Sequence, residues 1–195
     1  MIIGLTGTLG AGKSIVAEYL QKKGWVYFSL SHEVREEAKK QGIEITRENL
    51  QELGNDMRKK YGNDVLAQRI LMKITDPQKN YVIDGIRNPA EIMLFKQLGS
   101  FYLIAVDAPK QLRFQRLIAR NRESDPKTLY DFMRIDAIDQ GKDQTESGQQ
   151  TAECMKMADA VLVNDSTLER FWDKISFTVQ QLINKDSLNS VGTSF

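Results

Sequence analysis

Short apolar stretches alternate along the chain with longer segments that carry apolar residues at helical spacing. The apolar stretches predict five strands, at residues 2–6, 25–29, 81–84, 101–106 and 160–163. Strands that alternate with helices in this way are typical of a parallel sheet with helices on both faces. We therefore expect an α/β fold, a three-layer sandwich around a five-stranded parallel sheet.

The segment between the second and third predicted strands is the longest helical stretch. Residues 31–74 are predicted to be mostly helical in three pieces, with breaks near Gly42 and at residues 62–64. Glycine at these points ends a helix because it adopts backbone conformations that other residues avoid. We expect a small helical subregion to stand beside the sheet here.

Capping residues predict the start of three further helices. These signals are Asn88-Pro89, Asp125-Pro126 and the capping-box pair Ser166 and Glu169. The last helix is expected to end near Ile183, and the polar residues 185–195 are expected to form a frayed tail. Because no linker or repeat divides the chain, residues 1–184 are predicted to form one domain.

Composition and charge exclude several classes of partner. The chain has 195 residues, of which 41% are hydrophobic and 27% are charged, as in an ordinary globular domain. Its net charge of +1 gives no long-range field that would attract a nucleic acid polymer or an anionic membrane. No apolar stretch approaches the roughly 18 residues that a membrane span needs.

The cysteine content and the first residues of the chain indicate the cellular compartment of the protein. The single cysteine, Cys154, rules out an internal disulfide framework and fits a reducing compartment. Residues 1–5 lack the basic segment and cleavage site of a signal peptide. We expect a cytoplasmic protein that is a monomer or a weak oligomer.

A phosphate-binding motif follows the first predicted strand and opens the first predicted helix. The sequence fits G-x-x-x-x-G-K-[ST], the Walker A motif, in the context that this motif requires. Its residues are Gly7, Thr8, Leu9, Gly10, Ala11, Gly12, Lys13 and Ser14. Glycines let backbone N–H groups converge on phosphate oxygens at a helix N-terminus. In such loops the lysine reaches the β- and γ-phosphates and the serine hydroxyl binds Mg²⁺, so we expect ATP and Mg²⁺ as cofactors, with Lys13 catalytic.

The third predicted strand ends in a carboxylate, and an arginine follows it. Asp84 ends the apolar run at residues 81–84, where a P-loop enzyme places the acid that serves its magnesium. We therefore predict that Ser14 and Asp84 are the metal ligands. Arg87 lies three residues beyond Asp84, where its guanidinium can grip a phosphate through two hydrogen bonds. From its position alone, a surface arginine without a ligand is the other interpretation.

A cluster of arginines follows the fourth predicted strand. Arg113, Arg116 and Arg120 share one face of a predicted helix, and Arg122 follows them closely. Arginines stabilise the negative charge that gathers on a migrating phosphoryl group. A solvated basic face is the other interpretation of such a run.

These segments resemble those of nucleoside monophosphate kinases, and the likeness extends over about residues 2–182. Asp84-Gly-Ile-Arg87 resembles their Asp-Gly-x-x-Arg segment, although it is one residue shorter. Ser29-Leu-Ser-His-Glu-Val-Arg35 resembles the segment after their second strand, which ends in an acceptor-binding arginine. The resemblance implies P-loop nucleotide kinase topology and acceptor binding by helices at residues 31–75. It also implies that Ser29, Arg35 and Arg87 bind the acceptor.

Two further segments resemble nucleoside monophosphate kinases, and the first also resembles dephospho-CoA kinases. Val106-Asp-Ala-Pro109 and the arginines after it resemble the fourth strand and the start of the lid, which favours Arg116 and Arg120 as catalytic residues and residues 120–150 as the lid. Asn164-Asp-Ser-Thr167 resembles the loop that holds adenine, which implies that Asn164 binds the cofactor. A guanine-reading Asn-Lys-x-Asp motif is absent from the sequence, which favours ATP over GTP.

Three functions remain open at this point. The first is a kinase that transfers the γ-phosphoryl group to a nucleotide-like acceptor, most simply a nucleoside or deoxynucleoside monophosphate. The second is a dephospho-CoA kinase, although those enzymes usually carry an aspartate just after the second strand, where this chain reads Phe28-Ser-Leu-Ser31. The third is a regulatory P-loop ATPase without a phosphoryl acceptor.

Overall fold

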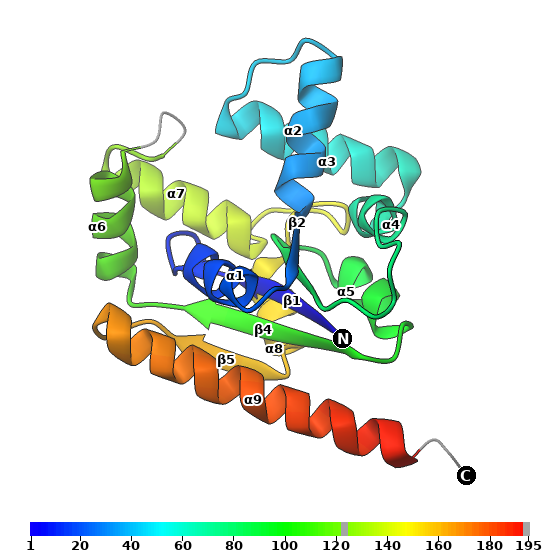
Figure 1. The fold of residues 1–195 in the computed structure, drawn as a ribbon. Helices are drawn as coiled ribbons and strands as arrows, with labels where there is room; N and C mark the ends of the chain where they lie inside the picture. The colour runs from blue at the N-terminus through cyan, green and yellow to red at the C-terminus, as the bar shows by residue number, and fades with distance from the viewer. Residues whose placement is uncertain (122–124, 193–195) are drawn as a thin grey trace.

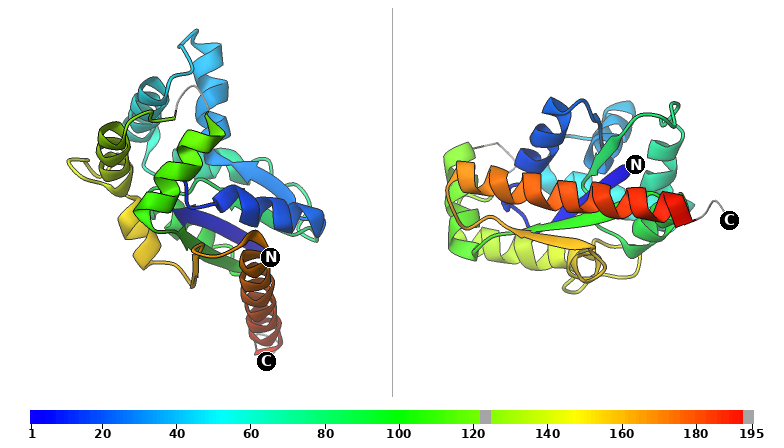
Figure 2. Two further views of the ribbon diagram at one scale, coloured as in Figure 1. Left: turned by 90° about the vertical axis from the view of Figure 1, so that its left-hand side faces the viewer. Right: turned by 60° about the horizontal axis from the view of Figure 1, so that its bottom comes forward.

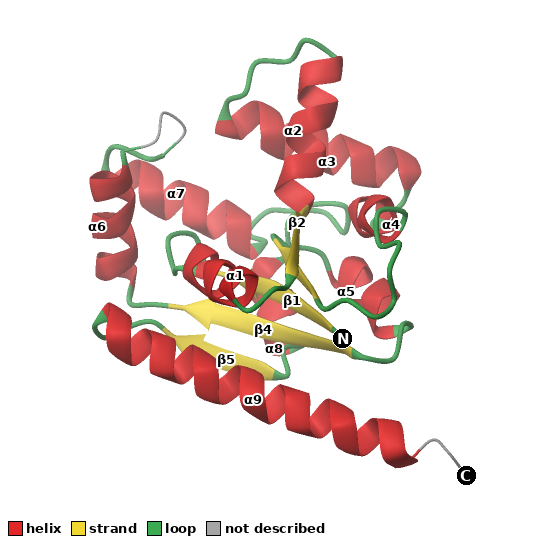
Figure 3. Cartoon of the chain, viewed as in Figure 1, coloured by secondary structure: helices red, strands yellow, loops and turns green. Residues whose placement is uncertain are grey.

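The five predicted strands form one parallel sheet. The computed structural model describes residues 1–121 and 125–192, with side chains to residue 189. The strand order is β2-β3-β1-β4-β5, with β1 in the centre (Figures 1 and 3). The strands are β1 (Ile2–Gly7), β2 (Val26–Ser29), β3 (Tyr81–Asp84), β4 (Phe101–Asp107) and β5 (Ala160–Val163). The predicted α/β fold class is confirmed.

The central strand is apolar throughout because helices cover the sheet on both sides. Every residue of β1 is buried, and the strand pairs in parallel with β3 and β4. Alternate residues point to opposite faces, so Ile83 packs in one core cluster and Val82 in the other. A strand buried on both faces is expected to carry a nearly continuous hydrophobic run.

Two helices cover one face of the sheet. They are α1 (Lys13–Lys22) and α9 (Leu168–Gly192), which share a core cluster with Val82 and Ile104. Figures 1 and 2 show α9 running along one side of the molecule beside β5 and β4. The helices α5 (Pro89–Lys96) and α8 (Thr151–Lys156) contribute Phe95 and Cys154 to the cluster on the opposite face. These two helical layers and the sheet complete the expected three-layer sandwich.

Two groups of helices stand beyond the carboxyl ends of the strands. The first group is α2 (Leu30–Lys40), α3 (Arg47–Tyr61) and α4 (Val65–Leu71), with breaks at the predicted places. The second group is α6 (Lys110–Arg120) and α7 (Leu129–Gln140). Figure 1 shows α2 and α3 at the top, α4 at the right and α6 at the left, with the phosphate loop between α2 and α6. Ligands in open α/β sheets bind at this edge.

Two predicted helix starts are wrong. The helix assigned to Asp125-Pro126 begins only at Leu129, because the side chain of Thr128 accepts a hydrogen bond from the backbone N–H of Asp131. The carboxylate of Asp125 binds Arg120 instead. The last helix begins at Leu168, where the hydroxyl of Thr167, and not that of Ser166, lies 3.4 Å from the N–H of Arg170.

The last helix also ends later than predicted. It continues to Gly192 instead of ending near Ile183, so most of the segment expected to be frayed is helical. No glycine or proline interrupts residues 184–191, and polar side chains tie this part to the sheet. Ser100 donates a hydrogen bond to Asp186 over 2.6 Å, and Asn189 donates one to the hydroxyl of Tyr102 over 3.3 Å. Residues 193–195 lie outside the described part of the chain.

Candidate functional site

The phosphate loop connects β1 to α1 with a backbone that only glycine can follow easily. Gly7, Gly10 and Gly12 all have positive φ angles, of 132°, 79° and 106°. A Cβ atom at Gly7 would lie 2.0 Å from the carbonyl oxygen of Val106 in the neighbouring strand β4. The glycines of the motif therefore allow both the turn and the close approach of the loop to β4.

Lys13 folds back over the loop that precedes it. Its ammonium donates hydrogen bonds to the carbonyl oxygens of Gly7 and Thr8, over 2.6 and 3.0 Å. Burial lowers the pKa of Lys13 to about 8, while the carboxylate of Asp84 acts in the opposite direction. The Ser14 side chain lies in the first turn of α1 and is exposed. A lysine in this position can exchange carbonyl partners for phosphate oxygens.

Asp84 carries an oxygen without a partner. Asp84 pairs with Leu5 of β1 in the parallel sheet, which places the carboxylate beside the phosphate loop. Oδ1 is buried and has no hydrogen-bond partner among the described residues, while the hydroxyl of Tyr27 donates to Oδ2 over 3.4 Å. Carboxylate and hydroxyl oxygens are the ligands that Mg²⁺ prefers. Ser14 and Asp84 therefore fit a magnesium site, with the unpartnered oxygen ready for the ion or one of its waters.

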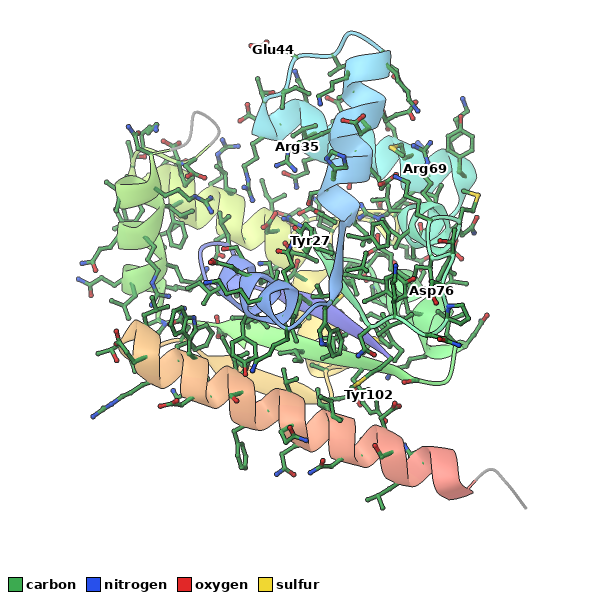
Figure 4. All side chains as sticks on the ribbon, in the orientation of Figure 1. Tyr27, Arg35, Glu44, Arg69, Asp76 and Tyr102 are labelled. Carbon is green, nitrogen blue, oxygen red and sulfur yellow. The ribbon has the colours of Figure 1, made fainter. Side chains whose placement is uncertain are left out.

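One cavity collects most of the predicted site residues. Its volume is about 580 Å³, within the range of small-molecule sites. Its walls include Leu9, Gly10, Gly12, Lys13, Ser14, Ser29, Arg35, Asp84, Arg87, Arg116 and Arg120. Figure 4 shows Arg35 on the side of α2 that faces α6 and α7, and Tyr27 below it on β2. The structure thus brings the phosphate loop, the acidic strand end and the four predicted arginines to one space, together with a fifth arginine, Arg47.

The arginines of α6 divide into two groups. Arg116 and Arg120 line the cavity. Arg116 donates to the backbone and side-chain oxygens of Asn164 over 3.0 and 3.1 Å. Arg120 makes a two-point contact with the carboxylate of Asp125 at 2.7 and 2.5 Å. Arg122 lies outside the described residues.

Arg113 does not face the cavity. It is 2% exposed and forms a two-point ion pair with Asp136 of α7, at 2.5 and 3.0 Å. It also donates to the carbonyl oxygens of Ala108 and Leu9, over 3.0 and 3.1 Å. The structure therefore makes Arg113 the support that joins the phosphate loop to α6 and α7.

Asn164 supports the phosphate loop from the other side. Its side chain is buried and donates to the carbonyl oxygen of Ala11 over 2.9 Å. A Cβ at Gly12 would lie only 2.5 Å from its amide nitrogen. Direct contact of Asn164 with a nucleotide stays a prediction, as do the predicted contacts of Thr8 and Ala11, which are buried.

Arg87 is bound by residues that the sequence did not indicate. Its guanidinium donates to Asp139 of α7 over 2.9 Å and to Gln149 over 2.8 Å. Asp139 also accepts from Arg47, the first residue of α3, over 3.0 Å. Arg47 and Asp139 are 92 residues apart in the chain. Neither belongs to a short motif, and only the tertiary fold brings them together.

A smaller chamber continues from the side of the cavity that α2 and α3 form. Its volume is about 90 Å³, and it lies among α2, α3 and α4. Ser31, Arg35, Arg47 and Arg87 line both spaces. The walls specific to the chamber combine apolar or small residues with polar ones. The apolar or small residues include Leu30, Val34, Leu50, Gly54 and Leu66, and the polar ones are Gln51, Arg58, Asp139 and Gln149. The predicted acceptor-binding helices thus form a pocket next to the phosphate loop.

Comparisons with known proteins show the family and the fold of this chain. The profile of the AAA domain family matches residues 3–146. A UPF0200 protein from Hyperthermus butylicus is 35% identical over 172 residues, which cover 88% of this chain and 89% of the relative. The chain belongs to the UPF0200 family. A second member, from Thermococcus gammatolerans, is 34% identical, and the match covers 94% of this chain and 96% of that relative.

Solved structures show that this UPF0200 member has the fold of P-loop kinases. Shikimate kinase from Acinetobacter baumannii, solved in complex with shikimate, superposes with a TM-score of 0.58 at 15% identity. That match covers 94% of this chain and 93% of the kinase. At this level of identity the likeness shows the fold alone. Within the described residues, no helix combines the length and apolar character needed to cross a membrane.

Replacing Arg113 with alanine is expected to destabilise the protein. The substitution leaves the carboxylate of Asp136 buried without its cation, which costs about 3–5 kcal/mol of unfolding free energy. Urea denaturation followed by circular dichroism measures the loss. Arg170→Ala, which changes an exposed arginine of α9, is the control and should alter stability little. Unchanged stability of Arg113→Ala, together with lost activity, would instead favour a catalytic role for Arg113.

Proposed function

We propose that this protein is an ATP- and Mg²⁺-dependent kinase that transfers the γ-phosphoryl group to a nucleotide-like acceptor, most simply a nucleoside or deoxynucleoside monophosphate. The observation that supports the proposal is the shared cavity. The phosphate loop and Asp84 form one part of its wall, and Arg35 and Arg87 form another. A donor and an acceptor phosphate can therefore approach each other inside one space.

The donor part of the proposal rests on Lys13, Ser14 and Asp84. Backbone N–H groups of residues 8–14 would surround the β-phosphate at the N-terminus of α1. Lys13 would release the carbonyl oxygens of Gly7 and Thr8 and bind the β- and γ-phosphates. Ser14 and Asp84 would hold Mg²⁺, which supplies charge neutralisation on the phosphate oxygens.

Arg116 and Arg120 would stabilise the migrating phosphoryl group. Both line the cavity, and Arg116 already lies against the phosphate loop, with its guanidinium 3.5 Å from the carbonyl oxygen of Ala11. Arg120 would exchange part of its contact with Asp125 for the phosphoryl oxygens. Charge that develops in the transition state is best stabilised by groups that are oriented beforehand.

The acceptor part of the proposal needs no general base. A phosphate monoester is largely a dianion near neutral pH, because its second pKa is about 6. One of its oxygens attacks the γ-phosphorus as the bond to the β-phosphate oxygen breaks, which leaves ADP and a new diphosphate. Ser29, Arg35 and Arg87 would position that oxygen.

A hydroxyl acceptor, as in dephospho-CoA kinases, fits the cavity less well. A hydroxyl gains from a carboxylate that takes its proton. The described carboxylates of this cavity are Asp84, which suits magnesium, and Asp125, which binds Arg120. The regulatory ATPase alternative leaves the arginines of the acceptor part without a role.

The lid at residues 120–150 stays part of the proposal, but its second half is anchored. Asn88 donates to the carbonyl oxygens of Glu146 and Gly148, over 2.8 and 3.2 Å. The N–H of Gln150 donates to the carbonyl oxygen of Arg87 over 2.7 Å. Because α7 is also held, through Asp136 and Asp139, closure over both substrates is expected to come from the end of α6 that carries Arg116 and Arg120.

Asp84→Asn is expected to weaken the response to magnesium. Loss of the negative oxygen should raise the Mg²⁺ concentration for half-maximal rate at least roughly tenfold, because charge-assisted contacts contribute about 1.5–3 kcal/mol. Titration of Mg²⁺ against rate measures it. Tyr27→Phe removes the hydroxyl beside Asp84 but keeps the carboxylate, so it should change the titration little. An unaltered magnesium requirement in Asp84→Asn would show that Asp84 is not a ligand.

Arg35→Ala and Arg87→Ala are expected to raise the KM for the acceptor and leave nucleotide affinity nearly unchanged. Each removes a charge-assisted contact, so the KM should rise roughly tenfold or more. Steady-state kinetics with the best nucleoside monophosphate of a panel gives the KM, and calorimetry gives the affinity for a nonhydrolysable ATP analogue. Arg69→Ala is the control, because Arg69 pairs with Glu37 outside the cavity. Weakened nucleotide binding in either test variant would mean that the acceptor assignment is wrong.

A further inference from the structure

Arginines from three separate segments meet on the acceptor side of the cavity. Arg35 comes from α2, Arg47 begins α3, and Arg87 follows β3. All three line both the large cavity and the small chamber beside it. The three arginines therefore surround the opening between the cavity and the chamber. An acceptor would occupy this opening if one part of it entered the chamber while its reacting group faced the phosphate loop.

Arg47 has an incomplete set of hydrogen bonds. Its side chain is 20% exposed, and its terminal nitrogen Nη2 donates to Asp139 over 3.0 Å. Its Nε is buried and has no hydrogen-bond partner among the described residues. A buried N–H that has left water without gaining a partner is costly. A ligand oxygen in the cavity would supply the missing acceptor.

Asp139 fixes the position of this arginine relative to Arg87. Its two carboxylate oxygens accept from Arg47 and Arg87, over 3.0 and 2.9 Å, and it is 4% exposed. Burial acts to raise the pKa of Asp139, but Arg87 and Arg47 outweigh burial and hold the pKa below its ordinary value. Asp139 is therefore an anion at neutral pH that orients both guanidinium groups.

The charges of this group define the ligand that fits it. A fourth arginine of the chamber wall, Arg58, is already neutralised by Glu91 in a buried ion pair. The other three arginines and the carboxylate of Asp139 carry a net charge of +2. A phosphate monoester carries close to −2 at pH 7 or above. A carboxylate carries −1 and would leave half of the positive charge unbalanced. Phosphate oxygens also accept several hydrogen bonds in the geometry that guanidinium forks present.

We propose that Arg47 is a third acceptor-binding residue, whose Nε–H donates to a phosphate monoester dianion held also by Arg35 and Arg87. This inference rests on the proposed function, because it assigns the acceptor part of the same cavity. It adds a specificity-determining residue and restricts the acceptor to phosphorylated compounds. Asp139 acts as the positioning residue for Arg47 and Arg87.

Nuclear magnetic resonance of arginine side chains tests the contact directly. The phosphate loop is first filled with Mg²⁺ and a nonhydrolysable ATP analogue, and inorganic phosphate is then titrated at pH 7.5. The Nε–H signal of Arg47, identified by its loss in Arg47→Lys, should shift with phosphate occupancy. Arg47→Ala should weaken phosphate binding at least tenfold, Arg47→Lys should restore part of it, and both should bind the ATP analogue within twofold of the unsubstituted protein.

Arg134→Ala is the matched control. Arg134 of α7 pairs with Glu48 of α3 over 3.3 Å, so it joins the same two helices as the Arg47–Asp139 pair but lies outside both cavities. If Arg47 acted only by holding α3 against α7, loss of this second α3–α7 ion pair should also lower phosphate affinity. We expect Arg134→Ala to leave phosphate affinity unchanged.

Two results would overturn the inference and leave the proposed function intact. One is unchanged phosphate affinity in Arg47→Ala, and the other is an equal response of the Arg47 signal to acetate. Failure of the unsubstituted protein to bind the ATP analogue would instead contradict the proposed function. In that case phosphate is titrated against Lys13→Ala, whose phosphate loop lacks its cation. The same titration is repeated with Arg47→Ala added, and the inference requires the same tenfold loss of phosphate affinity.

Discussion

The guanidinium of Arg113 lies where the phosphate loop, the end of β4 and α7 meet. It binds the carbonyl oxygens of Leu9 and Ala108 and the carboxylate of Asp136, and it is almost completely buried. A buried arginine needs all of these acceptors, because a charge without partners is not tolerated in the interior. The shape of the phosphate loop and the position of α7 are therefore set by the same side chain.

From this junction α7 extends to the acceptor side of the cavity. Asp136 and Asp139 are three residues apart, so both project from one face of the helix. Asp136 binds Arg113 beside the phosphate loop, and Asp139 binds Arg47 and Arg87 beside the small chamber. One rigid helix thus fixes the spacing between the two groups of residues that we propose bind the donor and acceptor phosphates. That spacing decides whether a donor and an acceptor phosphate can react.

Local sequence signals were sufficient for the fold and for the residues of contiguous motifs. The glycines and Lys13 of the phosphate loop were recognisable because their roles depend on neighbours within eight positions. Asp84 was predicted from its place at a strand end and Arg87 from the resemblance to nucleoside monophosphate kinases, and both line the cavity. Arg113 was grouped with Arg116 by spacing alone, and only packing shows that the two point to different surroundings. The pairs that include Arg47, Asp136 and Asp139 join distant segments, so no local pattern could reveal them.

The central claim is that the phosphoryl group passes from ATP to an acceptor phosphate held beside it. ³¹P nuclear magnetic resonance tests this most directly, with ATP, Mg²⁺ and, in turn, nucleoside monophosphates, deoxynucleoside monophosphates and dephospho-CoA. We predict ADP together with a new diphosphate product from at least one monophosphate, and neither product with Lys13→Ala. Release of inorganic phosphate alone in the presence of every acceptor, or transfer only to the hydroxyl of dephospho-CoA, would contradict the account.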